Sequence, residues 1–201
     1  RLTHFISGEP QNKSDLEGML TFADEHEIID DDARKIMVGA MLVTDMQVRD
    51  IMIPRAQMIV IDSDQPLQEA LPKIVQSGHS RYPVIGDGID DVIGMLLAKD
   101  LLPLIQNDGD VPSITELMRP VIAVPESKRL NVLLREFRQN RNHMAIVIDE
   151  YGGIAGLITI EDVLEEIVGE IEDETDVEEG QLIRPVNDNS FMVEALTPIE
   201  D

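Results

Sequence analysis

The stretch that decides the fold is VIGMLLAKD at positions 92–100, because the chain returns to the same pattern with IAGLITIED at positions 154–162. Each copy has a glycine at its third position and an aspartate at its ninth. A second repeated anchor precedes each copy, DIMIP at 50–54 and ELMRP at 116–120. The copies are about 62 to 66 residues apart, which is enough for a small unit of helices and strands in each. The sequence therefore predicts a duplicated module with two related clefts where the copies face each other, an arrangement suited to binding a ligand.

Both repeats predict the same order of elements, strand, helix, strand, strand and helix, from the spacing of their apolar residues. In repeat one we expect strands at 58–61, 82–85 and 92–96, and helices over 67–75 and from 99 onward. In repeat two we expect strands at 121–124, 144–148 and 154–158, and helices over 130–137 and about 161–171. This βαββα order predicts an α+β fold in which mixed sheets are flanked by helices.

Flanking segments complete the expected organisation. Residues 1–47 predict an N-terminal helical segment, with one helix that begins at Ser14 as its N-cap and a second from the acidic run at Asp30 to about Thr44. We expect repeat one at 48–105 and repeat two at 113–171, followed by an acidic linker at 172–181. Residues 182–201 are expected to begin a further domain that is cut short.

Composition excludes several classes of protein. A net charge of −24 and a pI near 4.3 exclude a nucleic-acid partner, because a phosphate backbone needs a basic face. The chain has no cysteine, so disulfides and thiolate metal sites are excluded. No stretch approaches the ~20 apolar residues of a membrane span, and a cytoplasmic location is expected. The four histidines are scattered and no nucleophile-base pair is evident, so an enzyme is not predicted.

Longer runs carry a resemblance to a known family. They are VRDIMIPR at 48–55, HSRYPV at 79–84, IDEYGG at 148–153 and TIEDVLEEIVGEI at 159–171. These runs, with the repeated anchors, resemble tandem cystathionine-β-synthase (CBS) repeats, which form a Bateman module. They resemble in particular the CorC family of bacterial magnesium and cobalt efflux proteins, which is related to the CNNM magnesium transporters.

The resemblance implies a regulatory module that binds AMP or ATP, with or without Mg²⁺, and modulates efflux of divalent cations. It also implies a head-to-head homodimer, a membrane cation transporter or membrane domain as partner, and a position at the inner face of the membrane. Residues 182–201 would then start the transporter-associated domain of this family. The alternative is a dimerisation and interaction scaffold that works without a nucleotide.

Thr159 and Asp162 are the first candidate site residues, because they lie three apart where a strand meets a helix. They could form a capping box at the helix start. The same geometry offers unpaired N–H groups and a hydroxyl to a phosphate, and a carboxylate to ribose hydroxyls. The resemblance assigns the phosphate to Thr159 and the ribose to Asp162. Repeat one keeps the aspartate as Asp100 but has Leu97 in place of the threonine, so its cleft is expected to bind less well.

The second candidate group comes from the start of a strand in repeat one. It provides a hydroxyl, a guanidinium suited to phosphate and an aromatic ring suited to packing a base. In the family pattern this segment faces Thr159 and Asp162 together with the first anchor. The group consists of Ile53, Pro54, His79, Ser80, Arg81, Tyr82 and Pro83. The sequence predicts no set of metal ligands. The acidic run after Glu170 is interpreted as a solvated linker, with a divalent-ion sensor as the alternative.

Overall fold

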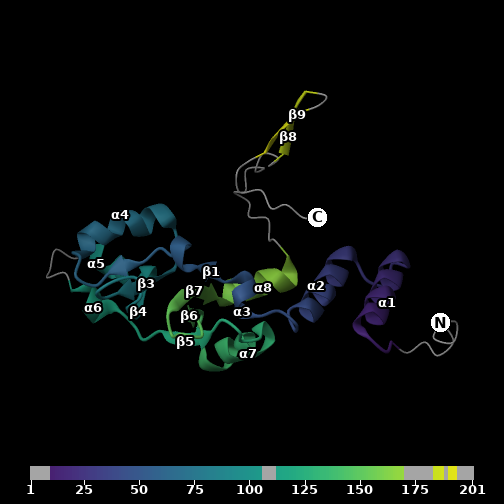
Figure 1. The fold of residues 1–201 in the computed structure, drawn as a ribbon, viewed down its shortest axis with the longest axis horizontal. Coiled ribbons are helices and arrows are strands. Elements are labelled where there is room, and N and C mark those ends of the chain that lie inside the picture. The colour runs from purple at the N-terminus through teal and green to yellow at the C-terminus, as the bar shows by residue number, and fades with distance from the viewer. Residues whose placement is uncertain (1–9, 106–111, 170–182, 188–189, 194–201) are drawn as a thin grey trace. The chain divides into compact units, whose positions relative to one another are not determined.

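The structure is a computed structural model that describes residues 10–105, 112–169, 183–187 and 190–193 (Figure 1). Its contacts divide the chain into two units, residues 1–169 and 170–201, and each is described by itself. The first unit contains both repeats, each built around a mixed sheet. Among the described residues, none of the helices is both long and apolar enough to cross a bilayer.

The sheet of repeat one has the strand order β2-β3-β4. Strands β2 (Ile61–Asp62) and β3 (Arg81–Ile85) are parallel, whereas β3 and β4 (Val92–Leu97) are antiparallel. Helix α4 (Leu67–Ser77) connects β2 to β3, as a parallel pair requires, and packs its apolar stripe on the sheet. The helix-facing core contains Ile61, Leu67, Ala70, Ile74, Tyr82, Val84, Leu96, Leu101 and Ile114.

The sheet of repeat two has the order β1-β7-β6-β5. Strands β5 (Ile122–Pro125) and β6 (Met144–Ile148) are parallel across helix α7 (Leu130–Asn140), and β7 (Ile154–Thr159) is antiparallel to β6. Helix α8 (Ile160–Val168) follows β7 directly. The α+β fold and the order of elements in each repeat are therefore confirmed.

The fourth strand of this sheet comes from the other repeat. Strand β1 (Ile53–Pro54) belongs to the first anchor, yet it pairs with β7, with Ile53 opposite Leu157 and Pro54 opposite Gly156. The second anchor does the reverse, because Arg119 forms an isolated antiparallel bridge with Met95 in β4. The leading segment of each repeat thus pairs with a strand in the sheet of the other repeat.

A glycine lies where each leading segment passes over the other sheet, Gly156 beneath β1 and Gly94 beneath the second anchor. A Cβ on Gly156 would overlap the carbonyl oxygen of Ile53 and lie 3.1 Å from its carbonyl carbon. A Cβ on Gly94 would lie 2.9 Å from Met118 Sδ and 3.1 Å from the carbonyl oxygen of Arg119. The glycine at the third position of each repeated stretch is therefore explained by the close approach of the crossing backbone.

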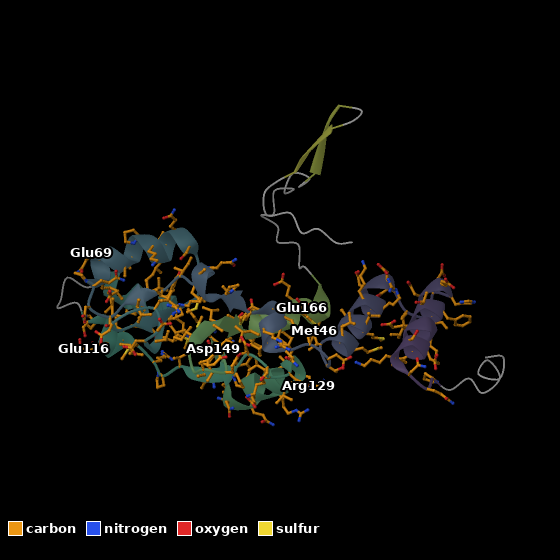
Figure 2. The ribbon with its side chains drawn as sticks, in the orientation of Figure 1. Met46, Glu69, Glu116, Arg129, Asp149 and Glu166 are labelled. Carbon is orange, nitrogen blue, oxygen red and sulfur yellow. The ribbon has the colours of Figure 1, made fainter. Side chains whose placement is uncertain are left out.

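Each anchor begins inside a one-turn helix, and the acidic residue of the anchor caps the start of that helix. In α3 (Val48–Ile51), Asp50 Oδ2 accepts a hydrogen bond of 2.7 Å from the Gln47 N–H. In α6 (Ile114–Leu117), Glu116, labelled in Figure 2, accepts one of 2.8 Å from the Ser113 N–H. The backbone N–H and then the hydroxyl of Ser113 lower the pKa of Glu116 from its usual value. The repeated acid of the anchor therefore caps a helix start.

The predicted strand at 58–61 was wrong at its start. The chain makes a 3₁₀ turn at η2 (Arg55–Gln57), and only Ile61 and Asp62 pair with β3. Met58 is buried in a small cluster beside β6 and β7, on the other sheet. Within the run, Met58, Ile59 and Val60 are therefore covered by side-chain contacts without strand pairing, and only Ile61 joins the sheet. In the same repeat the predicted helix at 99 begins as a 3₁₀ turn, η3 (Ala98–Leu101), followed by α5 (Leu102–Ile105).

Two helices precede the repeats. Helix α1 (Lys13–Glu25) is capped by Asn12, whose side chain accepts from the Asp15 N–H, so the predicted Ser14 cap was wrong by two residues. Helix α2 (Asp31–Leu42) begins in the predicted acidic run, and Asp30 is its N-cap. After α2 the chain meets the start of α7, where the Leu130 N–H donates to the carbonyl of Met46 at 3.1 Å (Met46 is labelled in Figure 2).

Helix α2 packs against α8, and Gly39 is the point of closest approach. A Cβ there would lie 2.5 Å from the carbonyl oxygen of Ile167 and 2.8 Å from that of Glu166, in the last turn of α8. The last carbonyl groups of α8 have no hydrogen-bond partner within the helix. Because Gly39 has no side chain, the backbone of α2 can lie directly against them.

The second unit is described only as an antiparallel hairpin of β8 (Ile183–Asn187) and β9 (Ser190–Val193). The strand expected around Phe191 lies in β9. The acidic linker predicted at 172–181 lies outside the described residues.

Candidate functional site

A cavity of about 380 Å³ opens where the two repeats meet. Its walls come from β1, η2 and the start of β3 in repeat one, and from β6, β7 and the first turn of α8 in repeat two. The residues that line it are Ile53, Gln57, Met58, Ile59, Gly78, His79, Ser80, Arg81, Pro83, Met144, Leu157, Thr159, Glu161 and Asp162. One wall is thus apolar, and the other carries a guanidinium, hydroxyls and the N-terminus of a helix.

Thr159 and Asp162 form a capping box at the start of α8. The Thr159 N–H donates to Asp162 Oδ2 at 2.7 Å, and the Asp162 N–H donates to Thr159 Oγ1 at 3.2 Å. These bonds use one carboxylate oxygen and a lone pair of the hydroxyl. They leave the hydroxyl proton and Asp162 Oδ1 available to a molecule in the cavity. The capping role and a ligand-binding role are therefore compatible in one geometry.

Arg81 reaches the same helix start from the other repeat. Its Nη1 lies 3.4 Å from Glu161 Oε1, and the Arg81 side chain is only 20% exposed. Glu161 also lies 3.7 Å from His143 Nδ1. The Arg81 guanidinium at the cavity therefore faces the Glu161 carboxylate of the other repeat. Glu161 was not among the predicted site residues, although its place in the first turn of α8 was a signal for it.

Most of the predicted site residues line the cavity, and two do not. Those that do are Ile53, His79, Ser80, Arg81, Pro83, Thr159 and Asp162. Pro54 is exposed on β1 beside Gly156. Tyr82 is fully buried under α4, and its hydroxyl donates to the Ile74 carbonyl at 2.9 Å and lies 2.8 Å from Ser77 Oγ. Side chains alternate along β3, so Arg81 and Pro83 face the cavity while Tyr82 faces the core.

The counterpart residues in repeat one have different surroundings. Leu97 is 8% exposed and belongs to the core. Asp100 accepts from Arg119 of the second anchor, with Nη2 at 2.7 Å and Nε at 3.1 Å from its Oδ2. The residues at the two matching positions thus differ in their chemistry, and the prediction that the repeat-one cleft binds less well stays a prediction.

Metal-binding groups were also sought. In the part of the chain that the structure describes, no three histidine or carboxylate side chains come together in a way that could hold a metal ion.

Comparison with known proteins decides the family. The model of the CBS domain matches residues 48–107 and 114–169. The magnesium and cobalt efflux protein CorC of Salmonella typhimurium is 47% identical over 200 residues, which cover the whole of this chain and 68% of that protein. The chain belongs to the CorC family of CBS-domain proteins. The predicted resemblance is therefore confirmed.

Solved structures of CBS domains have the same fold. The CBS domain of a bacterial CNNM/CorC family Mg²⁺ transporter in complex with ATP is 38% identical, with a TM-score of 0.65, and the match covers 69% of this chain and 99% of that one. A CBS-domain pair with bound AMP from Klebsiella pneumoniae is 33% identical, with a TM-score of 0.57, over 62% of this chain and all of that one. Two structural relatives of this chain thus contain an adenine nucleotide.

Proposed function

We propose that this chain is a regulatory, non-enzymatic module that binds AMP or ATP in the cavity between its repeats and thereby modulates magnesium and cobalt efflux. The observation that carries the proposal is the convergence of Arg81, Thr159 and Asp162 on one cavity. Each supplies a group that a nucleotide needs, namely a cation, a hydroxyl at a helix N-terminus and a free carboxylate oxygen.

The shape of the cavity supports the same proposal. Its volume of about 380 Å³ lies in the ~300–1,000 Å³ range of small-molecule sites, which are mostly apolar with a few placed polar groups. Ile53, Met58, Ile59 and Leu157 offer the apolar wall for a base, in place of the ring that was expected from Tyr82. The nucleotide would lie with its base on this wall, its ribose at Asp162 and its phosphate at Thr159 and Arg81.

The decisive experiment is a calorimetric titration of the protein with AMP, ATP and ATP plus Mg²⁺. We expect saturable binding of one nucleotide per chain, without release of phosphate. Absence of binding for all three ligands would instead favour a scaffold that dimerises and contacts a transporter without a nucleotide.

The position of Glu161 predicts that Mg²⁺ increases the affinity for ATP more than the affinity for AMP. Its carboxylate lies beside Arg81, where the β- and γ-phosphates of ATP would add like charge. A Mg²⁺ ion carried by the polyphosphate would offset this repulsion. We therefore expect Glu161→Gln to strengthen Mg²⁺-free ATP binding by roughly threefold to tenfold, a modest gain because Glu161 is 59% exposed and screened by water.

The control for this prediction is Glu165→Gln, which removes the same charge one turn later on α8, outside the cavity lining. AMP affinity should change little in either variant. An equal gain for Glu161→Gln with and without Mg²⁺ would contradict the proposed role of Glu161.

We also propose that the chain forms a homodimer through α4 and α8. Val75 on α4 is 78% exposed, and Leu164 and Val168 on α8 are 43% and 42% exposed, so both helices present apolar side chains that the repeats do not bury. Light scattering should give twice the chain mass of 22.5 kDa. Leu164→Glu should shift the mass toward the monomer, whereas Tyr151→Glu, at an exposed turn, should not. A monomeric mass for the unmodified chain at micromolar concentration would exclude the dimer.

The remaining organisation is proposed from the similarity to the relatives. The domain limits given above, an acidic linker and the start of a transporter-associated domain fit a CorC protein that is located in the cytoplasm. There it would act on a membrane cation transporter or a membrane domain, as expected for proteins named for magnesium and cobalt efflux.

A further inference from the structure

Exposed apolar side chains gather on the α1–α2 hairpin, residues 13–42, which precedes the repeats. Of the fourteen large apolar side chains that are exposed in the described part of the chain, seven belong to this hairpin. They are Leu16, Met19 and Phe22 on α1, Ile28 in the turn, and Ile36, Met37 and Leu42 on α2. Helix α1, which the structure describes in full, has no buried residue. The hairpin therefore carries an apolar surface that the described residues leave open.

Helix α2 has more apolar surface than its contacts cover. Residues 36–42 read IMVGAML, and seven consecutive residues reach every side of a helix that has 3.6 residues per turn. A helix that is apolar all round is normally buried. Of these seven residues only Gly39 is buried, where α2 packs against α8. The rest of the run has the composition of an interface with another element.

The charge of the hairpin restricts what can cover this surface. Residues 10–47 contain nine carboxylates against three lysine or arginine cations, a net charge of −6. All three cations already pair with carboxylates of the same segment. Within the described ranges, no cation pairs with Glu17, Glu25, Glu27 or Asp32. A second copy would bring the same negative charge, and an anionic lipid surface would repel the hairpin as well. A cationic partner is therefore favoured.

We infer that the α1–α2 hairpin docks a basic amphipathic helix of a partner protein. The apolar stripe of that helix would cover Met19, Phe22 and Met37, and its lysines or arginines would meet the four unpaired carboxylates. Methionine suits such a surface, because its unbranched side chain adapts to the shape of its neighbour. The inference rests on the proposed function for the source of the helix, since cytoplasmic segments of membrane proteins carry an excess of lysine and arginine.

The docking surface lies outside the nucleotide cavity but shares a helix with it. Helix α2 packs on the last turn of α8 at Gly39, whereas Asp162, in the first turn of α8, lines the cavity. None of the residues that line the cavity belongs to α1 or α2. Variants of the hairpin should therefore change docking and leave the affinity for AMP unchanged.

The test measures, by fluorescence anisotropy, binding of the whole chain to a labelled synthetic peptide with leucines on one face of a helix and lysines on the other. We expect saturable one-to-one binding that weakens as salt is added, because salt screens exposed charges. Phe22→Glu should weaken binding roughly tenfold to a hundredfold, as expected for an aromatic side chain at the centre of an interface. The added negative charge would by itself attract lysine, so a loss of affinity reports the apolar contact.

Matched variants locate the site. Tyr151→Glu makes the same change of charge at an aromatic side chain that is 90% exposed on a turn of repeat two, and it should have no effect. Glu25→Gln/Glu27→Gln should weaken peptide binding roughly threefold to tenfold. Glu69→Gln/Glu150→Gln removes two exposed carboxylates from the repeats and should change it little.

Several outcomes would overturn the inference. They include no peptide binding, and an equal loss of affinity in Phe22→Glu and Tyr151→Glu. A lower mass for Phe22→Glu in light scattering would show that the hairpin joins two copies. Binding of the unmodified chain to phosphatidylglycerol vesicles that Phe22→Glu abolishes would show that it meets lipid. Circular dichroism checks that α1 persists, and Met37→Glu on α2 is the second variant if it does not. Failure of every chain to bind AMP would refute the proposed nucleotide site and leave the docking result standing.

Discussion

Replacement of Thr159 by valine should weaken binding of AMP and ATP by roughly tenfold to a hundredfold. Valine keeps the shape of the side chain but cannot donate a hydrogen bond to a phosphate. One hydrogen bond to a charged group is worth about 1.5–3 kcal/mol, which gives this range of affinity. Calorimetry or equilibrium dialysis with the purified variant measures the loss.

Controls must separate the loss of a ligand contact from the loss of a helix cap, because Thr159 also caps α8. Thr159→Ser keeps the hydroxyl and should bind almost as well as the parent. Asn12→Ala removes the cap of α1, far from the cavity lining, and should cost about 1 kcal/mol of stability without changing affinity. If Asp100→Asn abolished binding while Thr159→Val did not, the site would lie in the other cleft.

Gly156→Ala is expected to have the largest effect on stability. The new methyl group would overlap the carbonyl of Ile53 and lie 3.3 Å from the Cα of Pro54, and both of these are backbone atoms that no change of rotamer can move away. Overpacking of this kind costs about 3 kcal/mol at the upper end of the usual range. For a chain of this size that loss lowers the melting temperature by roughly 6–12 °C. Differential scanning calorimetry measures the shift.

Gly88→Ala is the matched control, because a methyl group at this turn would meet no atom within 4 Å. Its melting temperature should stay near that of the parent. Because Ile53 lines the cavity, Gly156→Ala should also weaken AMP binding, whereas Gly88→Ala should not. A Gly156→Ala variant with the stability of the parent would show that β1 can shift away from β7 at little cost.

The sequence was sufficient for those helices and strands that have a local signal. The apolar stripe of α4 and the acidic run at the start of α2 are local patterns, and the structure has helices at both places. By contrast, the pairing of β1 with β7 joins segments a hundred residues apart and has no local pattern at all. Met58 shows the same limit, since its apolar run suggested a strand but its partners lie in the other sheet.

The candidate site was predictable where the geometry is local. Thr159 and Asp162 are three apart at a strand-to-helix junction, and this spacing is typical of a capping box. The placement of Tyr82 in the core and not in the site could be predicted only by knowing which face of β3 meets α4. Strand alternation next to Arg81 could have supplied it. Arg119 could have been found by aligning the two anchors, where an arginine replaces an isoleucine.

The exchange of leading segments between the two sheets has a consequence for how the module folds. Neither repeat carries a complete sheet of its own, since β1 completes the sheet of repeat two and Arg119 bridges the sheet of repeat one. Loss of either repeat would strip hydrogen-bonded backbone from an edge of the other. The duplication has therefore produced one cooperative unit rather than two independent domains, and a ligand that stabilises one repeat stabilises both.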